Sequence, residues 1–325
     1  MSEIHPLIII GSGPAAWTAA IYAARAQLSP VVLAGEQGGG QLMLTTRIEN
    51  YPGFPEGILG PELMAGMRRQ AEKLEVEIID KNAVSLKKEN GIFSVALNYS
   101  TSSFVQPLSL SPYPLALITA SAVILATGAT ANTLRIPGED RLMGRGVGTC
   151  AVCDAPFYKG KDRVFVIGGG DSAMEEAGEL AKFVKKVVIL VRKDAMRASA
   201  IMVNRIKRLQ NVEIWYKSEV KEFLGEKRLE KVRIAREGKE EVLTVDGAFY
   251  AIGHTPATGW LAGSGVEMDE TGYIKTNNSL PTMTSLAGVF AGGDCVDPKY
   301  KQAITAAGFG AMAALDAQRW LENKG

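Results

Sequence analysis

Two stretches of this sequence repeat one pattern, in which a short apolar run leads into a turn rich in glycine and then into a helix-forming segment. The first is PLIIIGSGPAA at residues 6–16, and the second is RVFVIGGGDSA at residues 163–173. A buried parallel strand followed by such a turn and a helix is the building unit of doubly wound α/β folds. Two such units in one chain predict an α/β protein with two Rossmann-like dinucleotide-binding domains.

The residues of the first turn suit the binding of a pyrophosphate. Gly11 permits the tight turn, Gly13 lets a phosphate approach the backbone, and Ala16 allows the helix to pack closely on the strand. The helix N-terminus adds N–H donors and partial positive charge. Glycine turns of this kind also occur in α/β cores without a ligand, but two copies in the same context argue against coincidence. A chain that holds two dinucleotides typically passes electrons between them, and FAD with a nicotinamide is the natural pair.

Charged residues downstream of each glycine turn indicate whether that unit binds FAD or a nicotinamide nucleotide. In the second unit, the apolar run KVVILV leads to Arg192 and Lys193, with Arg197 close behind, where an NAD site usually has an acidic residue. These cations suit a ribose 2′-phosphate, although a solvated basic turn has the same composition and Asp194 keeps NAD as an alternative. In the first unit, Glu36 either accepts a hydrogen bond from the adenosine ribose of FAD or is a surface turn residue.

Composition and charge exclude several functional classes. The chain has 36 Lys and Arg against 35 Asp and Glu, so no positive excess points to nucleic acid or an anionic membrane as the partner. No segment offers the roughly 20 consecutive apolar residues of a membrane span, and the N-terminal apolar run lacks the basic start of a signal peptide. Three cysteines do not make the framework of a disulfide-rich secreted protein, so we expect a soluble cytoplasmic protein.

Cys150 and Cys153 form a CxxC pair just upstream of the second glycine turn. A structural zinc site needs four ligands, and the chain otherwise offers only Cys295, His5 and His254, far apart along the sequence. Cys150 and Cys153 could instead be two buried unreactive thiols, because free cysteine often behaves as a small hydrophobe. We interpret Cys295 in that way. Two intervening residues let sulfurs close a small ring, and this spacing commonly lowers the pKa of one thiol. We therefore predict a disulfide that cycles between its oxidised and reduced forms.

Further motifs extend the pattern over nearly the whole chain. They follow one another as GSGPAAWTAAIYAARA, GGQL, ENYPGFPEGILGPEL, ATGA, CAVCD, GGGDSAMEEA, RKDAMRAS, AIGHTP and AGGDCVDPKYKQAITAAGFGAMAALDA. In these residues the chain resembles the low-molecular-weight, NADPH-dependent thioredoxin reductases, which are flavoprotein disulfide reductases. The resemblance implies that hydride passes from NADPH to FAD, that FAD reduces the disulfide, and that the dithiol reduces a thioredoxin or thioredoxin-like protein.

The resemblance also implies which residues form the sites. Cys153 would face the flavin, Cys150 would attack the partner's disulfide, and Asp154 would be the acid/base, with a turn or N-cap role as its alternative. For Asp294 and Gln302 the alternative is capping of the helix that begins near Gln302. The expected FAD contacts, besides Glu36, are Gly11, Gly13, Pro14, Ala15, Gln41, Asn50, Thr127, Gly128, Asp294, Gln302 and Ala303. The expected NADPH contacts are Gly168, Gly170, Asp171, Ser172, Arg192, Lys193, Arg197 and His254.

A few positions depart from the family pattern. Val191 stands where a histidine is common and Lys193 replaces an arginine, so we expect 2′-phosphate binding that is weaker but still cationic. Lys301 replaces the arginine that usually precedes Gln302. Residues 99–115 are longer than the corresponding segment of the family and rich in Ser and Pro, which predicts a surface insertion with no assigned role.

The order of the motifs predicts the domain plan. Residues 1–130 and 256–325 would form a discontinuous FAD domain, and residues 131–255 would form an inserted NADPH domain that carries the CxxC pair. The nicotinamide and the disulfide would both have to reach a flavin held by the other domain, and the disulfide would also have to reach an outside protein. We therefore expect the inserted domain to turn as a unit about connections near residues 127–134 and 252–260.

Two other functions compete with thioredoxin reduction. A related flavoenzyme would use another electron donor or oxidise small dithiols, and the changed Val191 and Lys193 leave room for it. A noncatalytic zinc or nucleotide-binding module would be colourless and would hold metal at its cysteines.

The resemblance to the family is also the sole basis for expecting a homodimer.

Overall fold

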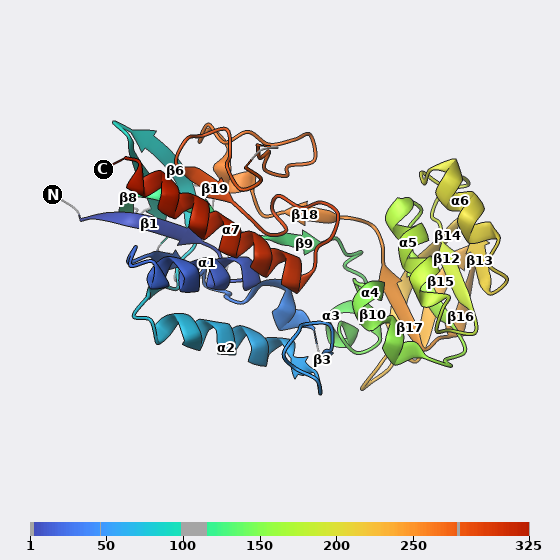
Figure 1. Ribbon diagram of the computed structural model, residues 1–325. Coiled ribbons are helices and arrows are strands. Elements are labelled where there is room, and N and C mark those ends of the chain that lie inside the picture. The colour runs from blue at the N-terminus through green and yellow to red at the C-terminus, as the bar shows by residue number, and fades with distance from the viewer. Residues whose placement is uncertain (1–2, 46, 99–115, 278–279, 325) are drawn as a thin grey trace. The chain divides into compact units, whose positions relative to one another are not determined.

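The computed structural model describes residues 3–45, 47–98, 116–277 and 280–324 (Figure 1). The chain divides into two compact units: unit 1 comprises residues 1–130 and 255–325, and unit 2 comprises residues 131–254. The insertion predicted at residues 99–115 lies outside the described residues. In the described part of the chain, no helix combines the length and the apolar character that crossing a bilayer requires.

Unit 1 is built on a seven-stranded sheet in the order β5-β2-β1-β8-β7-β6, with β19 joined to β8. β8 pairs with β1 along one side, and β7 and β19 share its other side. Because β5, β2, β1, β8 and β19 run parallel, their carboxyl ends meet at one edge of the sheet. The strands are β1 (Ile4–Ile10), β2 (Val31–Leu33), β5 (Glu77–Ile79), β6 (Ala83–Glu89), β7 (Ile92–Leu97), β8 (Ala116–Leu125) and β19 (Val289–Ala291), with a small separate pair of β3 (Arg47–Ile48) and β4 (Ile58–Leu59).

Small side chains let the helices of unit 1 pack closely. Figure 1 shows α1 between α2 and α7, and α1 and α7 make extensive contact. At Gly310 of α7 a Cβ would lie 2.1 Å from the carbonyl oxygen of Ala15 in α1, so only glycine permits this approach. The helices are α1 (Pro14–Arg25), α2 (Gly60–Glu72) and α7 (Ala303–Glu322), with short 3₁₀ turns η1 (Gly40–Leu44) and η4 (Gly259–Leu261).

Unit 2 has a five-stranded parallel sheet in the order β10-β17-β11-β12-β13 and a three-stranded antiparallel sheet, β14-β15-β16. Every residue of β11, β12 and β17 is buried, which explains their apolar runs. The strands are β10 (Val147–Gly148), β11 (Val164–Ile167), β12 (Val187–Leu190), β13 (Val212–Trp215), β14 (Ser218–Leu224), β15 (Lys231–Arg236), β16 (Lys239–Thr244) and β17 (Gly247–Tyr250). The helices are α3 (Glu139–Leu142), α4 (Ala151–Asp154), α5 (Asp171–Leu180) and α6 (Ala200–Lys207), with the 3₁₀ turn η3 (Ala155–Tyr158).

The two connections between the units contain β9 (Ala129–Ala131) and β18 (His254–Pro256), which pair with each other. Within unit 2, the buried carboxylate of Glu139 holds the end of the first connection by accepting the backbone N–H groups of Leu134 at 3.2 Å and Arg135 at 3.0 Å. The hydroxyl of Tyr250, at the end of β17, donates to the same carboxylate. One buried side chain thus anchors the points where both connections join unit 2.

Candidate active site

The first glycine turn is shaped by contact with the end of β8. Gly11 has a φ of +133°, and a Cβ there would lie 2.1 Å from the carbonyl oxygen of Ala126, so the position requires glycine. Gly13 is the N-cap of α1, and no side chain caps that helix. A Cβ on Gly13 would meet no atom within 4 Å. Open space therefore borders the first N–H groups of α1, and this space fits a pyrophosphate.

The second glycine turn repeats this geometry in unit 2. Gly168 has a φ of +153°, and a Cβ there would lie 2.3 Å from the carbonyl oxygen of Ala251. Gly170 is the N-cap of α5, again without a side-chain cap and with no atom within 4 Å of a Cβ. The predicted duplication therefore extends to the contacts of single atoms, and each unit offers one place for a dinucleotide.

The expected FAD contacts of unit 1 gather at one edge of its sheet. Gly11 to Ala15, Glu36, Thr127, Gly128 and Asp294 follow β1, β2, β8 and β19, whose carboxyl ends share that edge. Asn50 and Gln302 are 252 positions apart in sequence, yet Asn50 Nδ2 donates to Gln302 Oε1 at 3.2 Å. Ala303 is the first residue of α7.

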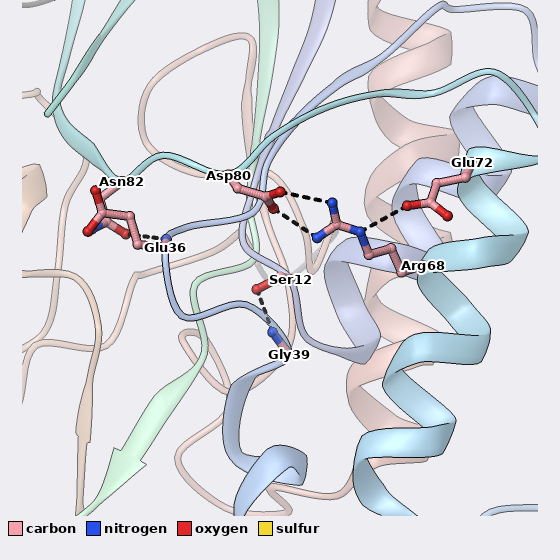
Figure 2. Close-up of polar contacts among 7 residues, drawn as sticks. All are labelled: Ser12, Glu36, Gly39, Arg68, Glu72, Asp80 and Asn82. Carbon is pink, nitrogen blue, oxygen red and sulfur yellow. Dashed lines mark hydrogen bonds and ion pairs between the residues drawn. The ribbon is translucent and has the colours of Figure 1, made fainter. Parts of the chain in front are cut away.

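A serine within the first turn holds the neighbouring loop in place. Figure 2 shows Ser12 and Gly39, where the Gly39 N–H donates to Ser12 Oγ at 2.9 Å in a buried position. This loop leads directly into η1, which contains Gln41. Motif reasoning missed Ser12, because its partner lies 27 positions away and no local signal marks it.

Glu36 lies at the exposed end of β2. Its backbone N–H donates to Asn82 Oδ1 at 3.2 Å (Figure 2). Its carboxylate lies 3.9 Å from Lys81 Nζ. The ion pairs of Arg68 with Glu72 and Asp80 in the same figure join α2 to the end of β5. They are contacts of the scaffold.

Two acidic residues before α7, Asp294 and Asp297, have different environments. Asp297 accepts the backbone N–H groups of Lys299 at 2.8 Å and Tyr300 at 3.0 Å, so Asp297 shapes the turn. The carboxylate of Asp294 makes no hydrogen bond to a described residue. Burial raises the pKa of Asp294 to about 6, with the charge of Asp297 adding to the rise and Lys301 opposing it. Capping is thus ruled out for Asp294, and its carboxyl group stays available to a ligand.

For Gln302, in contrast, the capping alternative holds. Gln302 is the N-cap of α7 and forms a reciprocal capping box with Thr305, whose hydroxyl accepts the Gln302 N–H at 3.3 Å. The capping role does not prevent contact with a ligand, because the backbone of Ala303 begins a 20-residue helix whose N-terminus carries partial positive charge.

The two thiols of the CxxC pair are joined as a disulfide. Cys150 and Cys153 have Cα atoms 5.4 Å apart, and the Cys153 N–H donates to Cys150 Sγ at 3.2 Å. Both residues are half-buried at the start of α4, while Val152 between them is exposed. Cys295 is fully buried, and burial raises the pKa of its thiol to about 11, so it is inert packing as predicted.

Asp154 follows the disulfide in a confined pocket of side chains. Burial raises the pKa of Asp154 to about 6. A Cβ on Gly148 would lie 3.1 Å from Asp154 Oδ2 and 2.9 Å from Phe249, so glycine leaves just enough room for the carboxyl group. Tyr158 packs edge-on against Phe249, and burial together with the nearby charge of Asp154 raises the pKa of its hydroxyl. Asp154 can therefore exchange a proton near neutral pH. Sequence reasoning missed Gly148 and Tyr158.

The remaining expected contacts of unit 2 follow neighbouring strands. Arg192 and Lys193 come after β12, and together with Arg197 they lie in the segment 192–197, which we call the cation loop. All three cations are exposed, and their side chains form no ion pair or hydrogen bond with a described residue. Half-buried His254 begins β18, a few residues after β17.

The order of the strands brings these parts of unit 2 to one edge of its sheet. The disulfide follows β10, His254 comes after β17, the second glycine turn follows β11, and the cation loop follows β12. In the sheet, these four strands are neighbours in that order and run parallel. The second glycine turn and the cysteine pair therefore lie at the same edge of the sheet.

Comparisons with known proteins agree with this geometry. A family model for pyridine nucleotide-disulphide oxidoreductases matches residues 5–310. The chain is 46% identical over 320 residues to the thioredoxin reductase of Mycolicibacterium smegmatis, which covers 98% of this chain and 97% of that protein. It is 45% identical to the bifunctional thioredoxin reductase/thioredoxin of Mycobacterium leprae, with 98% of this chain and 66% of that protein covered.

Solved structures give the same result. The structure of thioredoxin reductase from Giardia duodenalis has a TM-score of 0.88 and 39% identity, and the match covers 98% of this chain and all of the other. The predicted fold class and the family resemblance are confirmed. The chain belongs to the pyridine nucleotide-disulphide oxidoreductase family, and within it to the thioredoxin reductases.

Proposed function

We propose that this protein is an NADPH-dependent thioredoxin reductase with FAD held by unit 1 and NADPH held by unit 2. The observation that carries the proposal is the Cys150–Cys153 disulfide beside Asp154, on the same sheet edge as the second glycine turn. Its relatives are named as enzymes that reduce thioredoxin, and one of them is fused to a thioredoxin.

The residues of unit 1 fit FAD, which supplies the hydride-accepting and electron-passing chemistry that side chains lack. The open space at Gly13 and the uncapped N-terminus of α1 suit the pyrophosphate. The carboxyl group of Asp294, which no described residue engages in a hydrogen bond, suits hydroxyl donors such as those of ribitol. The N-terminus of α7 at Ala303 favours negative charge near it. Gln41, Asn50, Thr127 and Gly128 complete the proposed set.

The residues of unit 2 fit NADPH. Gly168 and Gly170 form the turn for its pyrophosphate, and Ser172 lies in the first turn of α5. The cations of the cation loop, which pair with no described residue, suit a 2′-phosphate, and His254 is proposed as a further contact. Val191 replaces the family's usual histidine with an apolar side chain, so the cations carry this recognition alone.

At the disulfide, the protein's own groups account for the sulfur chemistry. Two electrons open the Cys150–Cys153 bond and leave one sulfur as a thiolate and the other in need of a proton, and Asp154 can give or take that proton because its pKa lies near neutrality. The Cys150 thiolate then attacks one sulfur of the partner's disulfide, and the other partner sulfur leaves. Cys153 next attacks Cys150 in the mixed disulfide. The partner departs as a dithiol and the Cys150–Cys153 bond is restored.

We further propose that the enzyme works as a homodimer in the cytoplasm. A reducing compartment suits a chain whose cysteines are one cycling pair and one buried thiol. The dimer is supported by the family resemblance, and light scattering coupled to gel filtration would give about twice the 34.8 kDa of one chain.

The test uses the purified protein under anaerobic conditions. We expect a yellow flavoprotein that NADPH bleaches and that then reduces thioredoxin. Cys153→Ser should keep the flavin and its bleaching but lose thioredoxin reduction, because no disulfide remains to accept the electrons. Cys295→Ala, which removes the buried thiol, is the matched control and should keep activity.

Three results would contradict this function. A colourless protein would favour a noncatalytic nucleotide- or zinc-binding module. A flavin that NADPH leaves oxidised would favour a related flavoenzyme with another electron donor. Thioredoxin reduction that survives Cys153→Ser would exclude the disulfide as the carrier.

A further inference from the structure

We propose that Asp171 is a positioning residue that sets the preference for NADPH over NADH by fixing the cation loop against the second glycine turn. This inference rests on the proposed function and deepens one of its sites. Asp171 was expected from the sequence to contact the nucleotide, whereas its hydrogen bond directs it elsewhere. Its Oδ1 accepts the backbone N–H of Ser199 at 2.8 Å.

The glycine turn holds the C-terminal end of the cation loop through three successive residues. The carbonyl oxygen of Gly169 accepts the N–H groups of Arg197 at 2.7 Å and Ala198 at 3.0 Å. The bond from Ser199 to Asp171 follows immediately. The backbone at Arg197 is therefore fixed directly to the turn that would carry the pyrophosphate.

The N-terminal end of the loop is held by β13 and the residues after it. Val191 donates its N–H to Trp215 at 2.9 Å and accepts the N–H of Ser218 at 3.0 Å, and Lys193 accepts the N–H of Lys217 at 3.1 Å. The buried side chain of Val191 lies 3.1 Å from where a Cβ on Gly169 would stand. The loop is thus anchored at both ends, with its three cations next to the anchors.

Electrostatics explain why the orientation of Asp171 matters. Asp171 is the first residue of α5, where a carboxylate interacts favourably with the helix dipole but repels a bound pyrophosphate. The hydrogen bond to the Ser199 N–H turns Oδ1 of this carboxylate toward the residue two positions beyond the cation loop. It then helps the nucleotide through the loop's position and needs no contact with the nucleotide.

The benefit of a fixed loop depends on the 2′-phosphate. Long unpaired cations on a mobile backbone must be ordered when they bind a phosphate, and anchoring reduces that cost. NADH has no 2′-phosphate and gains nothing from the cations. Loss of the Asp171–Ser199 bond should therefore weaken NADPH binding and spare NADH binding.

The experiment measures equilibrium binding of NADP⁺ and NAD⁺ to the oxidised holoprotein by calorimetry. Asp171→Ala removes the acceptor, and Asp171→Asn keeps an acceptor oxygen without the charge. Ser199→Pro removes the N–H donor at a φ of −60° that proline accepts, and Ser199→Ala is its matched control with the donor kept. Two independent variants of one bond keep the test decisive if one of them folds poorly.

We expect Asp171→Ala and Ser199→Pro each to raise the Kd for NADP⁺ about three- to tenfold, the range of one hydrogen bond, with the Kd for NAD⁺ unchanged. The double variant should be no worse than either single one. Asp171→Asn and Ser199→Ala should keep the wild-type ratio of the two constants.

Several outcomes would overturn the inference. Equal weakening of both nucleotides would make Asp171 a structural part of the turn, and tighter NADP⁺ binding by Asp171→Ala would show that repulsion dominates. An effect of Asp171→Ala without one of Ser199→Pro would indicate direct contact with the nucleotide. Wild-type protein that binds no NADP⁺ would instead contradict the proposed function itself.

Discussion

Asp154 illustrates how burial tunes a single residue for its task. An exposed aspartate is ionised at neutral pH, but the walls formed by Gly148, Phe249 and Tyr158 raise the pKa of this one to about 6. Asp154 directly follows Cys153 in the sequence. Protonation near neutrality is therefore a property of the packing around one side chain.

The raised pKa has a consequence for stability, whose direction follows from proton binding. Between about pH 4 and 6 the folded protein holds the Asp154 proton more tightly than the unfolded chain does, so this group's contribution to stability falls as pH rises through that window. Asp154→Asn cannot ionise and escapes the loss. We expect the variant to gain about 2–3 kcal/mol relative to wild type between pH 4 and pH 8.

Denaturant unfolding of both proteins across this pH range measures the difference. Asp294 titrates in the same direction, but it is present in both proteins and its effect cancels. A difference that stays constant with pH would contradict the raised pKa.

At the scale of elements, the sequence predicted the local units well and their mutual contacts poorly. The glycine turns, α1 and the disulfide were predicted because each is specified by neighbouring residues. The Ser12–Gly39 bond and the room that Gly148 leaves for Asp154 were not predicted, because they arise only when distant segments meet.

The ends of α1 and β19 differ from those that the apolar pattern predicts, because residues with positive φ end both elements earlier. The Ala-rich sequence after the first glycine turn by itself predicts a helix to residue 27, but α1 ends at Arg25, because Gln27 has a φ of +60°. The run GVFAGGD at residues 288–294 by itself predicts a strand that ends at Asp294, but β19 ends at Ala291, and Gly293 with a φ of +81° turns the chain there. Both corrections leave the site residues at the sheet edge where the motifs implied them.

The bond between the first glycine turn and the neighbouring loop predicts a defect in flavin retention. Ser12→Ala removes the acceptor of the buried Gly39 N–H, so the loop that carries Gln41 should loosen. We expect the Kd for FAD to rise about three- to tenfold, measured by flavin release on dilution. Ser264→Ala, which removes another buried hydroxyl of unit 1 that accepts a backbone N–H, is the control and should retain FAD. Equal release from both variants would contradict a specific role for Ser12.

At the scale of the whole molecule, the two connections are where any turning of unit 2 must be absorbed. The paired β9 and β18 occupy the segments in which we predict that rotation, and Gly253 lies at the end of unit 2 with a φ of +93°. Only glycine moves freely through such conformations.

Gly253→Ala should therefore slow steady-state thioredoxin reduction several-fold, with a loss of stability of about 1 kcal/mol that comes from the positive φ alone. A Cβ there would make only an ordinary contact, 3.5 Å from Asn132 Nδ2. Gly238→Ala is the matched control, since Gly238 has a φ of +81° and open space but lies in the turn between β15 and β16. Equal turnover of the two variants would argue against a hinge at Gly253.

The duplicated turn also restricts how this chain can change over time. Gly11 closely approaches the carbonyl group of Ala126, and Gly168 closely approaches that of Ala251. Each of these alanines lies a few residues before the chain passes from one unit to the other. Each glycine turn is therefore in close contact with the segment that leads into a connection between the two units. A substitution that adds a side chain at Gly11 or Gly168 would displace the backbone that leads into a connection, as well as the proposed nucleotide site. Mutations at these turns would therefore also affect how the two units are connected.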